Sequence, residues 1–172
     1  LCCFIISQNN NIKRIKGIVQ RLCSCLGEPI PSSDCFSFPS PQRLATATLE
    51  ELEPLRCGFR AKYLLDAARR VSSGQVQLDA IPQMPLEQAR AHLMQIVGVG
   101  PKVADCALLY GFHRLECCPM DVWMKRVFAA LYPNGLPDCA QDFIGIAQQY
   151  LFHYARCCPQ ILETPEKEAA LV

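Results

Sequence analysis

Residues 93–121 read LMQIVGVGPKVADCALLYGFHRLECCPMD, and this stretch decides the fold. The turn Gly98-Val99-Gly100 separates two segments whose apolar residues recur at helical spacing, which predicts a hairpin of two helices. Lys102 follows in the first turn of the second helix, and Asp121 comes after a mostly apolar run. Apolar surroundings disfavour a charged ammonium, so the pattern indicates an amine nucleophile at Lys102, with Asp121 moving protons or stabilising a developing cation.

The paired glycines of this turn have two readings. Gly98 and Gly100 let the backbone approach a ligand closely, and the N–H groups at the start of the following helix suit a phosphate. Such a pair is equally typical of a tight turn that only joins two helices. The context of the pair has to decide between these two readings.

Composition limits the classes of function. The 172 residues are 51% hydrophobic and 19% charged, which predicts one folded domain and excludes a disordered chain. The formal net charge is +1, so any nucleic-acid surface has to be local. Basic residues cluster in three places, at Lys13, Arg14, Lys16 and Arg21, at Arg56, Arg60, Lys62, Arg69 and Arg70, and at Lys125 and Arg126. Each cluster is either part of such a surface or merely a solvated helix face.

The twelve cysteines favour reduced thiols. Three pairs are adjacent in sequence, no C-x-x-C occurs, and no cluster has the spacing of a zinc site. We therefore expect no metal site and an intracellular reducing compartment. The apolar residues 1–6 are too few to span a bilayer and lack the features of a signal peptide, so we expect no membrane association and regard the chain as the interior of a longer protein.

No segment alternates with period two and no internal repeat appears, so we expect an all-α fold. Residues 1–158 are expected to form the core and residues 159–172 a polar tail. Helices are predicted over residues 1–7, 12–26, 59–71 and 86–95, as a short helix directly after Gly100, at about 122–132 and 138–156, and after a capping box at residues 48–51. Residues 29–41 and 133–137 are predicted to be loops, and Gly27 is predicted to end its helix as a C′ residue.

Five sequence blocks together carry a resemblance. They are Ser7-Gln-Asn-Asn-Asn-Ile-Lys-Arg14, Cys57-Gly-Phe-Arg-Ala-Lys-Tyr63, Val97-Gly-Val-Gly-Pro-Lys-Val-Ala-Asp-Cys106, Pro119-Met-Asp-Val122 and Ala147-Gln-Gln-Tyr-Leu-Phe152. In this order they resemble the 8-oxoguanine DNA glycosylase/AP lyase branch of the helix-hairpin-helix DNA glycosylase superfamily. The resemblance implies a helical core that excises 8-oxoguanine opposite cytosine from duplex DNA during base excision repair, and then cleaves the strand by β-elimination.

The resemblance also implies a catalytic pair and a base pocket. Lys102 would attack C1′ of the damaged nucleotide and form a Schiff base, although a lysine here could also only contact phosphate. Asp121 would stabilise the sugar cation while it caps the next helix. Gln148 and Phe152, one turn apart, match residues that read and stack on the extruded base, and Cys106 matches the opposite wall; alone, the spacing of Gln148 and Phe152 is equally typical of packing.

Four further residues match those that handle the gap in the duplex. Asn9 and Phe59 would fill the space left by the extruded base, and Arg14 and Arg60 would read the orphaned cytosine. Phe59 could instead be a core residue, and the arginines could be plain surface charges.

Some features depart from the family's pattern. Trp123 stands where relatives often carry a histidine that touches phosphate, and the family's amino-terminal β-rich domain is absent from these residues. Two alternatives stay open, an endonuclease III-like glycosylase for oxidised pyrimidines without its iron–sulfur cluster, and a helix-hairpin-helix module that only binds DNA.

The resemblance sets the remaining expectations about partners. It implies no organic or redox cofactor, with a monovalent cation at the hairpin carbonyls as a further expectation. It implies damaged double-stranded DNA as the partner of a monomer. The expected location is the nucleus in a eukaryote or the cytoplasm in a bacterium.

Overall fold

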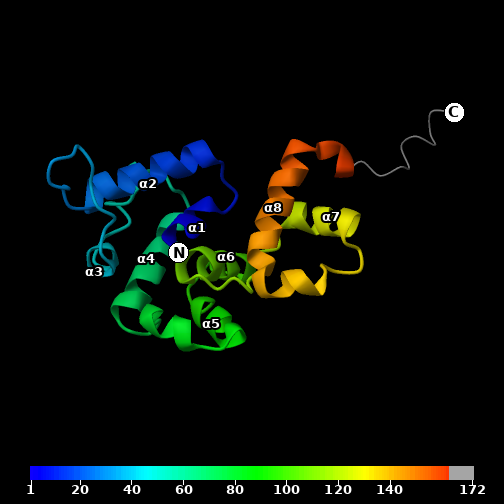
Figure 1. The fold of residues 1–172 in the computed structure, drawn as a ribbon. Coiled ribbons are helices and arrows are strands. Elements are labelled where there is room, and N and C mark those ends of the chain that lie inside the picture. The colour runs from blue at the N-terminus through cyan, green and yellow to red at the C-terminus, as the bar shows by residue number, and fades with distance from the viewer. Residues whose placement is uncertain (163–172) are drawn as a thin grey trace. The chain divides into compact units, whose positions relative to one another are not determined.

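The computed structural model describes residues 1–162 of the chain (Figure 1). In these residues the only β-pairing is an isolated bridge between Pro29 and Phe36, so the all-α prediction is confirmed. None of the helices in residues 1–162 is long and apolar enough to cross a membrane. The elements in chain order are α1 (Cys2–Ser7), α2 (Ile12–Leu26), α3 (Pro41–Ala45), η1 (Glu53–Leu55), α4 (Arg60–Ser72), η2 (Leu78–Gln83), α5 (Leu86–Leu93), α6 (Pro101–Phe112), α7 (Val122–Leu131), η3 (Asp138–Phe143), α8 (Ile144–Cys157) and η4 (Pro159–Leu162).

The chain divides into two compact units, Leu1–Ala107 and Leu108–Val172, where one core was expected. In the first unit α4 contacts α1 and α3, while α2 contacts α1 and η1. Its buried side chains include Ile18 and Leu22 of α2 and Leu64 of α4. The apolar stripe of each of these helices is therefore buried within the first unit, as their spacing predicted.

Helix α2 begins and ends where the sequence predicted, but it ends for a different reason. The Asn11 side chain caps its start by accepting a hydrogen bond from the Arg14 N–H. Gly27 at its end has φ −85°, so it is not the left-handed C′ residue that we expected. A Cβ at Gly27 would lie 1.9 Å from the Ser37 carbonyl oxygen. The glycine is required because another backbone segment passes this close.

The segment between α2 and α4 contains one element that was missed. Helix α3 starts at Pro41, and the Ser40 side chain caps it by accepting from the Arg43 N–H. A serine before a proline is a usable start signal, but the predicted loop covered it. The capping box is confirmed: Thr48 N–H donates to Glu51 at 2.8 Å, and Glu51 N–H donates to the Thr48 hydroxyl at 3.2 Å. It opens turns that lead into η1, not an α-helix.

The second unit has its own small core. Met124 and Val127 of α7 are buried against Ala155 of α8. The predicted helix at about 138–156 is in fact two elements, η3 and then α8, because the chain breaks at Phe143 with φ −129°. Side chains of η4 also pack on this core, so residues 159–162 belong to the unit although the polar tail was expected to include them. The rest of that tail, residues 163–172, lies outside the described residues.

All twelve cysteines lie in the described part of the chain and carry thiols, not disulfides. This agrees with the prediction made from their sequence spacing. Cys57, Cys106 and Cys117 are buried, whereas five others are exposed: Cys3, Cys25, Cys35, Cys139 and Cys157. Burial raises the pKa of the Cys57 thiol. In residues 1–162, no group of three or more His, Cys, Asp or Glu side chains could hold a metal ion.

Candidate functional site

The hairpin between α5 and α6 has the geometry that its glycines predicted (Figure 1). Gly98 has φ +81°, and a Cβ there would lie 2.3 Å from a ring carbon of Tyr63. Both the backbone conformation and the contact therefore require glycine at this position. Gly100 differs, because a Cβ there would meet nothing within 4 Å. Its carbonyl accepts the first helical hydrogen bond of α6, from Ala104 N–H at 3.0 Å.

Lys102 lies in the first turn of α6, one residue after the N-terminal Pro101. It is exposed, whereas Val103 and Ala104 are buried. The residues of the first unit therefore do not cover this amine, and its shielding by apolar walls stays a prediction. The first turn of the helix stands at the surface, and burial begins with the next residue.

Asp121 is the N-cap of α7, as the sequence predicted. Its Oδ1 accepts a hydrogen bond from the Met124 N–H at 2.8 Å. The residue is exposed, and its Oδ2 accepts no hydrogen bond from the described residues of its own unit. The cap holds one oxygen and leaves the other available to a ligand. Because Lys102 and Asp121 lie in different units, their pairing stays a prediction.

Phe59 stands immediately before α4 and is 52% exposed, which excludes the alternative that it is a core residue. Its ring makes an edge-on contact with Tyr63, with 5.7 Å between ring centroids. The Arg60 guanidinium lies over the Phe59 ring, 4.4 Å from its centroid. An aromatic ring that has two such contacts and is open to solvent can act as a wedge.

Arg60 does not have the surface position that its predicted role implied. It is only 3% exposed. Its Nε donates to the Gln8 carbonyl at 2.9 Å and its Nη2 to the Asn9 carbonyl at 2.9 Å, with Nη1 on the Cys57 carbonyl at 3.2 Å. Burial, followed by the nearby Arg14 charge, lowers the pKa of this guanidinium. Arg60 thus holds the backbone turn at Asn9, and reading a cytosine would require it to release these carbonyls.

The turn that Arg60 holds has an unusual backbone. Asn9 has φ +45° and is exposed, so its side chain is open to a ligand. Asparagine is among the few side chains that tolerate this left-handed conformation. Three guanidinium bonds fix the two carbonyls of this turn. The backbone of the exposed Asn9 is thus held in place by Arg60.

Two more arginines bind backbone carbonyls of the η1 segment, which the sequence did not indicate. Arg14 donates to the Arg56 carbonyl at 3.0 Å, and Arg21 donates twice to the Leu55 carbonyl, at 3.2 and 2.8 Å. Within residues 1–162 no carboxylate pairs with Arg14, Arg21 or Arg60. Their positive charges are therefore uncompensated, which favours an anion on this side of the first unit.

The expected base-pocket residues are divided between the units. Gln148 and Phe152 lie one turn apart on α8, where Gln148 is 4% exposed and Phe152 is 36% exposed. The Gln149 amide donates to the Gln148 Oε1 at 2.5 Å. Cys106 is buried on α6 in the first unit, so its place on the opposite wall stays a prediction.

Trp123 packs against the Met124 core of the second unit. Its indole Nε1 is buried and has no hydrogen-bond partner in the described part of the chain. The residue thus serves packing and does not present a donor at the surface, as a phosphate-binding histidine would.

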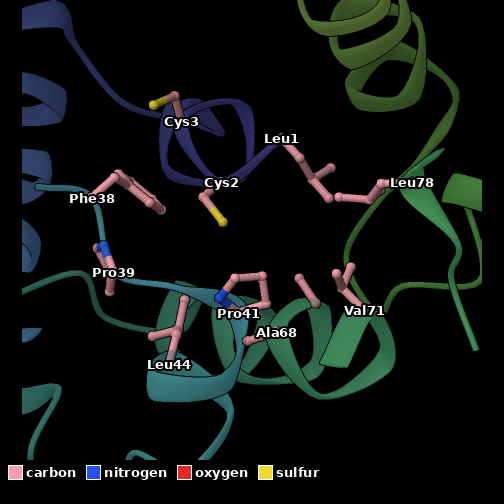
Figure 2. Close-up of a pocket in the computed structure, with 11 residues that line it drawn as sticks. Leu1, Cys2, Cys3, Phe38, Pro39, Pro41, Leu44, Ala68, Val71 and Leu78 are labelled. Atoms are coloured by element: carbon pink, nitrogen blue, oxygen red, sulfur yellow. The ribbon is translucent and has the colours of Figure 1, made fainter. Parts of the chain in front are cut away.

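A separate apolar pocket of about 350 Å³ lies in the first unit and is lined by Leu1 and by residues of α1, α3, α4, η2 and the segment before α3. Figure 2 shows Leu1, Cys2, Phe38, Pro41 and Val71 around it. None of the residues predicted to bind DNA or to react lines this pocket. It is therefore distinct from the hairpin region.

Comparison with known proteins identifies similar chains. Residues 2–137 match the family described as HhH-GPD superfamily base excision DNA repair protein. The N-glycosylase/DNA lyase of Saccharomyces cerevisiae is 39% identical over 141 residues, which cover 74% of this chain and 38% of the relative. This chain therefore spans well under half the length of that relative.

Two solved structures are also similar. A structure described as MBOgg1 in complex with a low-affinity DNA ligand has a TM-score of 0.82 and 41% identity, and the match covers 92% of this chain and 59% of that one. The Clostridium acetobutylicum 8-oxoguanine glycosylase/lyase, in complex with double-stranded DNA containing cytosine opposite 8-oxoG, has a TM-score of 0.77 and 32% identity. That match covers 90% of this chain and 57% of the other.

Proposed function

The chain belongs to the HhH-GPD superfamily of base excision DNA repair proteins, and from this premise we propose that it is a bifunctional DNA glycosylase and AP lyase. The proposed substrate is 8-oxoguanine opposite cytosine in duplex DNA. One observation carries the proposal: an exposed lysine follows directly on a hairpin whose Gly98 is required by both backbone conformation and packing. A relative named N-glycosylase/DNA lyase and a neighbour solved with cytosine opposite 8-oxoG support the substrate class.

In the proposed reaction the Lys102 amine attacks C1′ while the bond from C1′ to the base breaks. The base leaves with a proton, and opening of the sugar ring gives a Schiff base between Lys102 and C1′. Loss of a proton from C2′ then expels the 3′ phosphate oxygen and cleaves the strand. Bound DNA would exclude water from the exposed Lys102, and this desolvation favours the neutral, nucleophilic amine.

Asp121 would act on the charge that develops as the base leaves. One oxygen is held by the helix cap, so the other has a defined direction for an electrostatic or proton-transfer role. We propose that the carboxylate stabilises the sugar cation, since it lies exposed at the start of α7 with one oxygen free of the cap.

The extruded base leaves a gap that the first unit can fill. The exposed ring of Phe59 and the exposed side chain of Asn9 are the proposed fillers, with Arg14 at the edge of the orphaned cytosine. Gln148 and Phe152 are proposed to read and stack on the flipped base. We propose that the chain acts as a monomer, and that this chemistry uses side chains alone.

The proposal predicts that affinity for duplex DNA falls steeply with salt. If the hairpin and basic faces neutralise about five phosphates, log Kobs should fall against log salt with a slope of about −4.5. Fluorescence anisotropy with a duplex that carries an abasic-site analogue measures this slope. A slope near zero would contradict a phosphate-binding surface.

Replacing Gln148 with Ala should lower base excision by roughly tenfold to a hundredfold, because the lost amide contacts are worth about 1–3 kcal/mol. Cleavage at a preformed abasic site should change much less, since that substrate has no base to read. Single-turnover rates on the two duplexes measure the difference. Gln141→Ala, on η3 in the same unit, is the matched control. Equal losses on both duplexes would make Gln148 a structural residue.

The experiment that tests the function itself is a panel of lesions. Duplexes that hold 8-oxoguanine, thymine glycol or uracil opposite defined bases are incubated with the chain, and released base and strand cleavage are measured. Release of 8-oxoguanine with cleavage supports the proposal. Preference for thymine glycol supports the endonuclease III-like alternative. If the chain binds the duplexes but releases a base from none of them, the DNA-binding module is supported.

A further inference from the structure

Helix α4 makes two contacts with the hairpin turn in the first unit. The ring of Tyr63 lies directly against Gly98, where no Cβ would fit. One turn further along the helix, Asp66 Oδ2 accepts a hydrogen bond from the Val97 N–H at 2.7 Å. The same oxygen accepts from Arg70 Nε at 2.9 Å. The backbone of the turn is thereby attached to α4 at two successive residues.

We propose that Asp66 is a positioning residue that fixes the hairpin turn on α4, where the Tyr63 ring packs against Gly98. The inference rests on the proposed function, since it concerns how the turn is presented to DNA. The turn leads into α6, whose first residues include Lys102. The direction of the α6 start relative to α4 therefore depends on the Asp66 contact.

The same helix begins beside the proposed wedge. Phe59 precedes α4 and contacts Tyr63, and Tyr63 contacts the turn. Tyr63 of α4 thus connects Phe59, the proposed wedge in the duplex, to the hairpin turn, which is proposed to contact the DNA backbone. Asp66 holds the far end of this connection through the Val97 N–H.

The hydrogen bond between Asp66 and the Val97 N–H lies near the surface. The Asp66 side chain is 26% exposed and Val97 is 51% exposed, so little apolar area depends on the bond. A carboxylate beside a phosphate-binding turn also repels DNA through space. Long-range electrostatics alone therefore predict that removing Asp66 tightens DNA binding, whereas a positioning role predicts that it weakens binding.

The test compares Asp66→Ala and Asp66→Asn in the full chain. Binding is measured with a duplex that carries a tetrahydrofuran abasic analogue opposite cytosine. Asp66→Ala is expected to weaken binding about tenfold and to speed amide exchange at Val97 about tenfold or more, about 1.4 kcal/mol for one lost hydrogen bond. Asp66→Asn should stay within about threefold of the unaltered chain, since its amide oxygen accepts the same bond.

Glu87→Ala is the matched control for binding. It also removes one negative charge and one ion pair with an arginine of its own helix, and it lies on α5, outside the hairpin turn. It should leave affinity equal or slightly higher. Arg70→Gln serves as the control for exchange, because it removes the ion pair and keeps the Asp66–Val97 bond.

DNA affinity and Val97 amide exchange test separate parts of the proposal. Equal or tighter binding by Asp66→Ala overturns the positioning role, and unchanged Val97 exchange overturns the contact itself. If the unaltered chain binds no duplex, the proposed function fails together with the role of Asp66 in DNA binding. The exchange measurement needs no DNA, so it separates that failure from a failure of the hairpin contact.

Discussion

Replacing Lys102 with Gln is expected to abolish the covalent adduct that borohydride traps between the chain and nicked DNA. The loss should be at least roughly a thousandfold, because an amide cannot form a Schiff base. Lys102 is exposed in the first turn of α6, so the substitution should leave the thermal unfolding midpoint almost unchanged. Gel analysis of trapped adduct and a thermal melt provide the two measurements.

Lys102→Arg is the control that keeps the positive charge. It should bind duplex DNA within about threefold of the unaltered chain and trap nothing, since the guanidinium stays protonated. Adduct formation by Lys102→Gln would show that another amine is the nucleophile. Absence of any adduct with the unaltered chain would favour the module that only binds DNA.

Asp121→Asn should separate the chemistry of this carboxylate from its structural role. Asparagine caps a helix as well as aspartate does, so the stability of the second unit should be retained. Base excision should fall by about 10²- to 10⁴-fold, the usual range for a lost proton-transfer or charge-stabilising group. Single-turnover excision rates and thermal unfolding measure the two effects.

Asp121→Ala adds the loss of the cap to the loss of the charge. It should cost about 1 kcal/mol of stability beyond the Asn variant, because the Met124 N–H loses its acceptor. Excision should fall as far as in Asp121→Asn. If Asp121→Asn excises as fast as the unaltered chain, the residue is a cap and has no part in the reaction.

The sequence predicted well those features that depend on neighbouring residues. The start of α2 at Asn11, the capping box at Thr48 and the N-cap at Asp121 each use a side chain and an N–H three residues apart. The hairpin was equally predictable, because a positive φ at Gly98 and helical spacing on either side are local properties.

The partners of Arg14, Arg21 and Arg60 could not be predicted, because they are distant in sequence. Arg60 bonds carbonyls about fifty residues away, and Arg14 and Arg21 bond carbonyls of the η1 segment. Their spacing on helices is equally compatible with solvated faces, so periodicity cannot reveal such partners. Arg60 is the clearest case: a charged residue was expected at the surface and is buried, because backbone oxygens supply the acceptors that it needs.

The exposure of Lys102 was missed for a related reason. Its apolar neighbours in sequence pack inward from Val103 onward, and sequence alone does not tell which side of the first turn of α6 faces solvent. The break between η3 and α8 was also not predictable from spacing. Gly145 N–H bonds the Leu115 carbonyl at 2.9 Å, and a Cβ there would lie 2.4 Å from the Cys117 carbonyl oxygen.

The buried and exposed thiols allow local unfolding of each unit to be measured by cysteine labelling. Cys57 and Cys106 are buried in the first unit and Cys117 in the second, so a pulse of an alkylating reagent reaches them only when that unit opens. The exposed cysteines react at once and serve as the internal standard. Mass spectrometry of the labelled peptides would then give separate opening rates for the two units, with no probe introduced and no residue changed.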